Sequence, residues 1–299
     1  MTSVAELLAW GIGRLRTSGS EAARLEAELL LARALGVERA VLLAHPEIPV
    51  GADAQRSFAA DLERRAAGEP LAYIRGFREF YGLAFATDPR GLIPRPETEL
   101  LVEAAETEIM RRLTGAPRPV GTSPLRVADV GTGSGAIAVS LAVLLRRRGI
   151  GPQVEILASD DSPVALELAR ENAVGHGVAD RIEFVALDLL PTRVGRPFEV
   201  IVANLPYVPS GEVDRLPVAV SFEPRRALDG GPDGLAIIAR LLDRLPDALA
   251  AGGLALLEIG ADQGEAICRL AGARLPGWPC RVATDLAGHP RLARLERPS

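Results

Sequence analysis

Apolar residues recur at spacings of three and four over the first 70 residues of the chain, the pattern of amphipathic helices. Ser3 and Glu6 match a capping box, Ser20 is a candidate cap for a second helix, and Gly36 suits its end. Helices are therefore expected over residues 4–16, from Ser20 to Gly36, near 41–46 and over 52–67. Residues 1–70 predict a small helical bundle, whose modest core suits docking better than catalysis.

From Leu71 the pattern changes to a cluster of aromatic residues interspersed with glycines. Aromatic residues form only 4% of the chain, so their concentration after Leu71 predicts a hairpin-like connector over residues 71–98. Packing between domains is favoured for this cluster over direct contact with a ligand. The connector ends in the sequence LIPRPETE, where Pro96 suits the first turn of a helix and Arg95 is held between two prolines.

Short apolar runs alternate with helical patterns in residues 99–299. This alternation predicts an α/β fold with an open, mostly parallel sheet. Residues 110–124 are expected to form a loop before the sheet. Strands are expected over 126–130, 154–159, 182–187, 198–203 and 253–259, helices over 136–145, 163–174 and 235–249, and a terminal antiparallel pair over 280–285 and 292–295.

A buried strand runs directly into a polar and aromatic turn at Asn204, Leu205, Pro206 and Tyr207. In open α/β sheets, ligands bind outside the carboxyl ends of the strands, so an amide and a tyrosine placed there suit a substrate site. Asn and Pro are also ordinary turn residues, and the pattern alone leaves that alternative open.

A glycine-rich loop follows the first expected strand, with the pattern Asp-x-Gly-x-Gly-x-Gly. Its glycines permit close approach of a ligand to the backbone, but their spacing differs from the dinucleotide fingerprint. Acidic residues at the ends of the next two strands suit ribose hydroxyls and an adenine edge, and they favour a cationic cofactor, S-adenosyl-L-methionine, over NAD. The residues expected to bind it are Gly131, Thr132, Gly133, Ser134, Gly135, Asp160, Asp188, Leu189 and Asn204.

Composition narrows the class of protein further. The net charge of −5 argues against a broad nucleic-acid surface. Cys268 and Cys280 lack the spacing and neighbouring ligands of a metal site, so no metal is expected. No signal peptide is visible, and no stretch approaches the roughly 20 apolar residues of a membrane span. A cytoplasmic protein with reduced thiols is expected.

Together, these stretches resemble the release-factor glutamine methyltransferases known as PrmC or HemK. The resemblance covers nearly the full length, and it implies a class I S-adenosylmethionine-dependent methyltransferase fold over residues 99–299 with residues 1–70 as the release-factor docking domain. LIPRPETE and GGPDGL are more specific than the glycine loop. The matching segments are residues 92–99, 129–138, Asp160, Asp188, 204–207, 222–224, 227–228, 230–235 and 285–288.

The turn at Asn204 departs from the family, which usually has Asn-Pro-Pro-Tyr, because Leu205 replaces the first proline. The resemblance implies that Asn204 orients and polarises the target glutamine amide in the Gly-Gly-Gln loop of class 1 release factors. The Leu205 carbonyl would accept the second amide hydrogen, and Tyr207 would wall the pocket. Leu205 keeps a carbonyl and is held extended by Pro206, so activity should be retained.

Three alternatives stay open at this point. A DNA adenine methyltransferase would use a similar turn, although the net charge and the lack of a basic domain disfavour it. A glutamine methyltransferase of a ribosomal protein is disfavoured by the Arg-Pro-Glu-Thr-Glu stretch. A protein that binds the cofactor and release factors without catalysis is disfavoured by the intact Asn204, Asp160 and glycine loop.

Overall fold

The computed structural model describes residues 2–115, 123–191 and 195–299. The chain forms two compact units, one of residues 1–77 with 217–222, the other of residues 78–216 with 223–299. None of the described helices has the length and apolar character needed to cross a membrane.

The first unit is helical, as its apolar spacing predicts. The capping box is present, with the Glu6 carboxylate accepting from the Ser3 backbone N–H at 2.8 Å. The cap expected at Ser20 is wrong: its hydroxyl donates to Glu26 instead, and the helix begins three residues later. A core that includes Leu15, Leu30 and Phe58 fills the unit. Its elements are α1 (Val4–Thr17), α2 (Ala23–Leu35), α3 (Arg39–Ala44), α4 (Ala52–Ala66), α5 (Leu71–Arg75) and the 3-10 turn η4 (Val218–Phe222).

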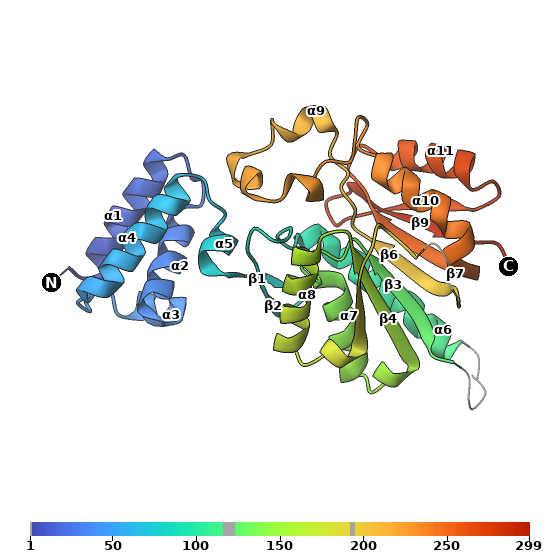
Figure 1. Ribbon diagram of the computed structural model, residues 1–299. Helices are drawn as coiled ribbons and strands as arrows, with labels where there is room; N and C mark the ends of the chain where they lie inside the picture. Colours follow the sequence, from blue (N-terminus) through green and yellow to red (C-terminus); the bar gives the residue numbers. More distant parts are fainter. Residues whose placement is uncertain (1, 116–122, 192–194) are drawn as a thin grey trace. The chain divides into compact units, whose positions relative to one another are not determined.

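The second unit is built on a seven-stranded sheet in the order β5-β4-β3-β6-β7-β9-β8, in which β9 runs antiparallel to both of its neighbours, β7 and β8. The expected α/β class and mostly parallel sheet are confirmed, and Figure 1 shows β4, β3, β6 and β7 side by side. The strands are β3 (Leu125–Val130), β4 (Val154–Asp160), β5 (Ile182–Ala186), β6 (Phe198–Ala203), β7 (Leu249–Glu258), β8 (Cys280–Thr284) and β9 (Pro290–Glu296).

Successive side chains of the central strands enter two separate cores. In β3, Val127 packs in the core that includes residues of α6 and α7, and Ala128 packs in the core that includes residues of α10 and α11. This period of two is the pattern of strands covered on both faces. The helices are α6 (Glu99–Thr114), α7 (Ala136–Arg147), α8 (Pro163–Gly175), α9 (Ser210–Val213), α10 (Ala236–Ala248) and α11 (Gly264–Arg274).

Shorter elements connect these layers. The strands β1 (Phe77–Phe80) and β2 (Leu83–Ala86) form a two-stranded sheet ahead of η1 (Pro96–Thr98) and α6. The loop expected over 110–124 is wrong at its start, because α6 continues to Thr114, while residues 116–122 lie outside the described chain. The remaining 3-10 turns are η2 (Gly151–Gln153), η3 (Ala179–Arg181) and η5 (Arg225–Ala227).

Cys268 and Cys280 form a disulfide, so the expectation of reduced thiols is wrong. α11 packs on β8 and β9, and it brings the two Cα atoms to 5.5 Å, within the range that a disulfide spans. The 12-residue separation along the chain gave no sign of this proximity.

Candidate functional site

The strand order reverses between β3 and β6, and the site lies at this switch point. The two strands are parallel neighbours with Val130 opposite Ala203, so Gly131 and Asn204 leave the sheet side by side. A Cβ on Gly131 would lie 2.8 Å from the Leu205 side chain, and its φ of 72° disfavours other residues. The glycine is therefore required by the turn after Asn204.

The glycine loop is fixed to β4 by hydrogen bonds from its backbone. The N–H groups of Gly131 and Thr132 each donate to the Ser159 carbonyl at 2.8 Å. The Gly133 N–H donates to the Asp160 carboxylate at 2.9 Å. These bonds hold the loop open in front of α7, with space beside Gly133 that no neighbouring atom fills.

Asp129 secures the same loop from inside the core. Its Oδ2 accepts from the Thr132 hydroxyl at 2.7 Å and from the Ala138 N–H at 3.1 Å. Complete burial raises the pKa of the Asp129 carboxyl to about 7, although both hydrogen bonds oppose the rise. Asp129 is thus a support of the loop.

A pocket of about 1070 Å³, including its open mouth, lies over the glycine loop and the Asn204 turn. Most of the residues predicted from sequence meet there, although they come from four strand ends. Gly135 and Tyr207 are the predicted residues that do not line it. Those that do are Gly131, Thr132, Gly133, Ser134, Asp160, Asp188, Leu189, Asn204, Leu205 and Pro206.

The acidic groups of the pocket differ in their partners. Asp161 is paired with Arg226 and Asp188 with Arg240. Among the described residues, Asp160 has no guanidinium partner and accepts only from backbone N–H groups, those of Gly133 and Ser162. Burial raises the pKa of the Asp160 carboxyl above its ordinary value.

Basic side chains around the pocket are also neutralised. Arg90 pairs with Asp88 and Glu171, and Arg95 pairs with Glu223. These guanidinium groups and the acids at 161 and 188 are already in ion pairs. The carboxylate of Asp160 is therefore the charged group of the pocket that remains available to a ligand. A cofactor with hydroxyl donors and a positive charge fits this site, whereas a pyrophosphate would meet an unpaired carboxylate.

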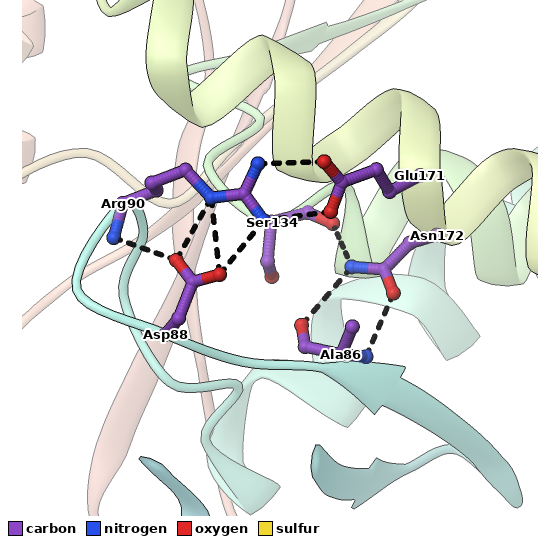
Figure 2. A network of polar contacts seen from close by, with 6 residues as sticks. All are labelled: Ala86, Asp88, Arg90, Ser134, Glu171 and Asn172. Carbon is purple, nitrogen blue, oxygen red and sulfur yellow. Dashed lines mark hydrogen bonds and ion pairs between the residues drawn. The ribbon is translucent and has the colours of Figure 1, made fainter. Parts of the chain in front are cut away.

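A polar network ties the segment after β2 to α8 and the glycine loop (Figure 2). Arg90 donates to Glu171 at 2.7 Å, and the amide of Asn172 exchanges hydrogen bonds with the backbone of Ala86. The same amide donates to the Ser134 carbonyl at 2.9 Å. This role does not follow from the sequence, where the one signal is an asparagine inside a predicted helix.

The LIPRP segment is anchored by Glu223, which is almost fully buried. The Ile93 N–H donates to Glu223 Oε2 at 2.9 Å, and the Arg95 guanidinium donates to Oε1. Both segments are recognisable as motifs in the sequence, but their pairing joins positions 130 residues apart and is not.

The Asn204 turn is held by two side chains from other segments of the chain. Asn204 Nδ2 donates to the Thr98 hydroxyl oxygen at 3.0 Å. The Tyr207 carbonyl accepts from the Gln263 amide at 2.9 Å, and the Tyr207 hydroxyl lowers the pKa of the buried Glu258 carboxyl. Burial raises the pKa of Tyr207 to about 12, so this hydroxyl keeps its proton at neutral pH.

The GGPDGL stretch packs against the backbone of the same turn. The Gly230 N–H donates to the Val208 carbonyl at 2.8 Å. A Cβ on Gly230 would lie 2.6 Å from the Pro206 carbonyl oxygen and 2.8 Å from the Tyr207 Cα, and Gly234 is similarly close to Tyr207. These glycines are therefore supports of the turn, and neither lines the pocket.

Comparison with known proteins agrees with this architecture. Residues 118–222 match the family model of the methyltransferase small domain. A crystal structure of a methyltransferase from Pyrococcus furiosus has a similar fold, with a TM-score of 0.50 and 16% identity, over 79% of this chain and 99% of that one. The fold and the site define a class I methyltransferase.

Two curated relatives extend the similarity along the chain. A release factor glutamine methyltransferase of Moorella thermoacetica is 42% identical over 96% of this chain and 95% of its own length. One from Rhodopirellula baltica is 37% identical over 99% and 96%. Residues 6–76 match the model of the PrmC N-terminal domain. The chain belongs to the family of release factor glutamine methyltransferases.

Proposed function

We propose that this protein methylates the side-chain amide nitrogen of glutamine in the Gly-Gly-Gln loop of class 1 peptide chain release factors. The observation that carries the proposal is the Asn204 amide at the switch point, bordering the same pocket as the glycine loop and Asp160. The family relationship supports the choice of acceptor. We place the reaction in the cytoplasm, without direct binding of nucleic acid.

S-adenosyl-L-methionine is the methyl donor that this site suits, and when bound it supplies an electrophilic methyl group on a sulfonium. Gly131, Thr132, Gly133, Ser134 and Gly135 would form the loop that holds it. Asp160 would accept from its ribose hydroxyls, and Asp188 with Leu189 would border the adenine. The unpaired charge of Asp160 supports this assignment, because it favours a cationic ligand.

The substrate amide would be held by the Asn204 turn. The Asn204 side-chain oxygen and the Leu205 carbonyl would accept the two hydrogens of the amide –NH2. These acceptors become stronger partners as the nitrogen gains positive charge, so they stabilise the transition state more than the ground state. Tyr207 would pack on the planar group beside Pro206, and one amide proton would leave to water after transfer.

The role that we assign to each part of the chain is the one that the family relationship suggests. We assign residues 1–70 to release-factor docking, residues 71–98 to the connector and residues 99–299 to catalysis. The match of residues 6–76 to the PrmC N-terminal domain supports the first assignment.

Transfer of a labelled methyl group to purified release factor tests the proposal, with mass spectrometry locating the product. Wild-type protein should label the glutamine of the Gly-Gly-Gln loop. Asn204→Ala should abolish labelling while leaving cofactor binding partly intact. A release factor with that glutamine replaced serves as the matched substrate control.

Labelling of the release factor in which that glutamine is replaced, or turnover by Asn204→Ala equal to wild type, would contradict the assignment. Purified ribosomal protein and DNA, assayed in parallel, test the other acceptors for this class of enzyme.

A further inference from the structure

Residues 91–98, the bridging segment, connect the glycine loop with the Asn204 turn. At the start of the segment, a Cβ on Gly91 would lie 3.4 Å from the Ser134 nitrogen. At its end, the Thr98 hydroxyl oxygen accepts from Asn204 Nδ2 at 3.0 Å. Most residues between these ends also line the pocket. One continuous segment therefore borders both the part of the pocket that suits the cofactor and the part that suits the acceptor.

The bridging segment is stiff in its middle. Pro94 and Pro96 each fix their own φ at about −65°, and a residue before proline is restricted to extended backbone. Ile93 and Arg95 both precede a proline, and Arg95 is extended, with φ −101° and ψ 141°. The Thr98 N–H donates to the Arg95 carbonyl at 3.1 Å. A displacement of the middle of the segment is therefore passed on to its end.

Glu223 holds this stiff part with both oxygens of its carboxylate. Its side chain is only 1% exposed, and it does not line the pocket. Oε2 accepts from the Ile93 N–H at 2.9 Å, and Oε1 accepts from the Arg95 guanidinium. These two charge-assisted bonds attach alternate residues of one extended run to a single buried group. Two attachment points fix both the position and the rotation of the run.

We propose that Glu223 is a positioning residue for methyl transfer, which acts through the bridging segment on the pocket wall and on Asn204. The sheet fixes the backbone where the glycine loop and the Asn204 turn begin, but the bridging segment lies outside the sheet. Transfer requires the reacting groups to be close and in line, and a misplacement of about 1 Å can cost about 100-fold in rate. This inference rests on the proposed function, since it adds a residue to the same site.

The transfer rate of Glu223→Gln tests this role. The substitution keeps the size of the side chain, but its –NH2 can only donate, as can the Arg95 guanidinium, so one of the two contacts is lost. In a single turnover at saturating S-adenosyl-L-methionine and release factor, methyl transfer should be about 10- to 100-fold slower than in wild type. The dissociation constant for the cofactor, measured by titration calorimetry, should change by less than about twofold. Glu265→Gln, which breaks an exposed ion pair with Arg269, is the matched control and should change neither quantity.

Substitutions of Arg95 test the same contact from its partly exposed partner. Arg95→Met removes the donor and should slow transfer, whereas Arg95→Lys keeps a charged donor and should restore part of the rate. Arg95 lines the pocket and Glu223 does not, so the double variant separates a direct role of Arg95 from placement. Glu223→Gln with Arg95→Met should be about as slow as the slower single variant, because both changes break one contact. Losses of rate that multiply would overturn the proposal.

Hydrogen exchange at the Ile93 amide, followed by NMR in the cofactor-free protein, is independent of turnover. In wild type this N–H is bound to a buried carboxylate and should exchange slowly. It should exchange about tenfold faster in Glu223→Gln, because a charge-assisted bond is roughly twice as strong as a neutral one. The Gly131 amide, which donates to the Ser159 carbonyl, should be unchanged. Equal acceleration at both amides would mean general loosening of the fold and would contradict a local role.

The outcomes separate the two proposals. Wild-type protein that does not label release factor would overturn the proposed function. With active wild-type protein, a Glu223→Gln variant that transfers methyl at the wild-type rate would overturn the positioning role alone. The same holds if the slower transfer of the variant is matched by an equal loss of cofactor affinity.

Discussion

The side-chain amide of Gln263 bridges two backbone segments at the site: Nε2 donates to the Tyr207 carbonyl at 2.9 Å, and Oε1 accepts from the Gly260 N–H at 2.8 Å. Gln263 is buried, and removal of its amide would leave the buried Gly260 N–H and the part-buried Tyr207 carbonyl without this partner. Position 263 thereby joins the end of β7 to the Asn204 turn.

Gln263→Leu should lower the free energy of unfolding by about 2–5 kcal/mol, because each buried backbone group left without a partner costs roughly 1–3 kcal/mol. Urea denaturation measures the change. Gln153→Leu, at an exposed position, is the control. Equal stability of the two variants would mean that the bridge contributes nothing.

Asp160→Asn should weaken binding of S-adenosyl-L-methionine by about 10- to 100-fold, since it removes the unpaired charge worth roughly 1.5–3 kcal/mol in a charged hydrogen bond. Titration calorimetry gives the dissociation constants. Asp161→Asn is the matched control. Because the Asp161 carboxylate already pairs with Arg226, this substitution should weaken cofactor binding far less. The assignment of Asp160 fails if the two variants bind equally well.

Leu205→Pro should keep kcat near wild type, because the carbonyl at position 205 remains. It should lower stability by about 1–2 kcal/mol, since the smaller ring fills less of the space beside Gly131. Leu205→Ala, which empties that space without stiffening the chain, should cost about 2–5 kcal/mol. Unfolding curves and turnover measured on both variants check this. A Leu205→Pro variant more stable than wild type would show that packing of the leucine side chain does not stabilise the fold.

Wild-type stability should fall as pH rises from about 5 to about 7, because the unfolded chain ionises Glu258 first while the folded state still holds its proton. The pKa of Glu258 is about 7 in the folded protein, against an ordinary 4.5. The free energy of unfolding should therefore fall by up to about 3 kcal/mol over this pH range. Glu258→Gln should remove this part of the pH dependence of stability. The variant should be more stable than wild type at pH 8 but not at pH 4. The raised pKa of Asp129 contributes equally to the pH dependence of stability in both proteins. Urea denaturation gives the free energy of unfolding of each protein across this pH range. If the two free energies change with pH in parallel, the effect is excluded.

Much of the fold follows from local patterns. The period of two in β3 and the capping box at Ser3 predict their elements because neighbouring residues determine them. The carboxyl ends of parallel strands meet at one edge, so the sequence alone predicts that Asn204 and the glycine loop lie close together.

The supports of the site could not be predicted in this way. Thr98 and Gln263 are ordinary residues in sequence, and their partners lie 106 and 56 positions away. The disulfide between Cys268 and Cys280 likewise depends on how α11 packs. Such pairings are set by tertiary packing, which no local pattern encodes.

The glycines at 230 and 234 fit against the backbone of Pro206 and Tyr207 and remain outside the pocket. One of the two most specific motifs of the chain therefore depends on the shape of a turn rather than on the identity of the molecule that binds there. A protein that kept this motif while its docking domain diverged would present the same acceptor geometry to a different amide, and specificity in such enzymes could change without any change at the motif.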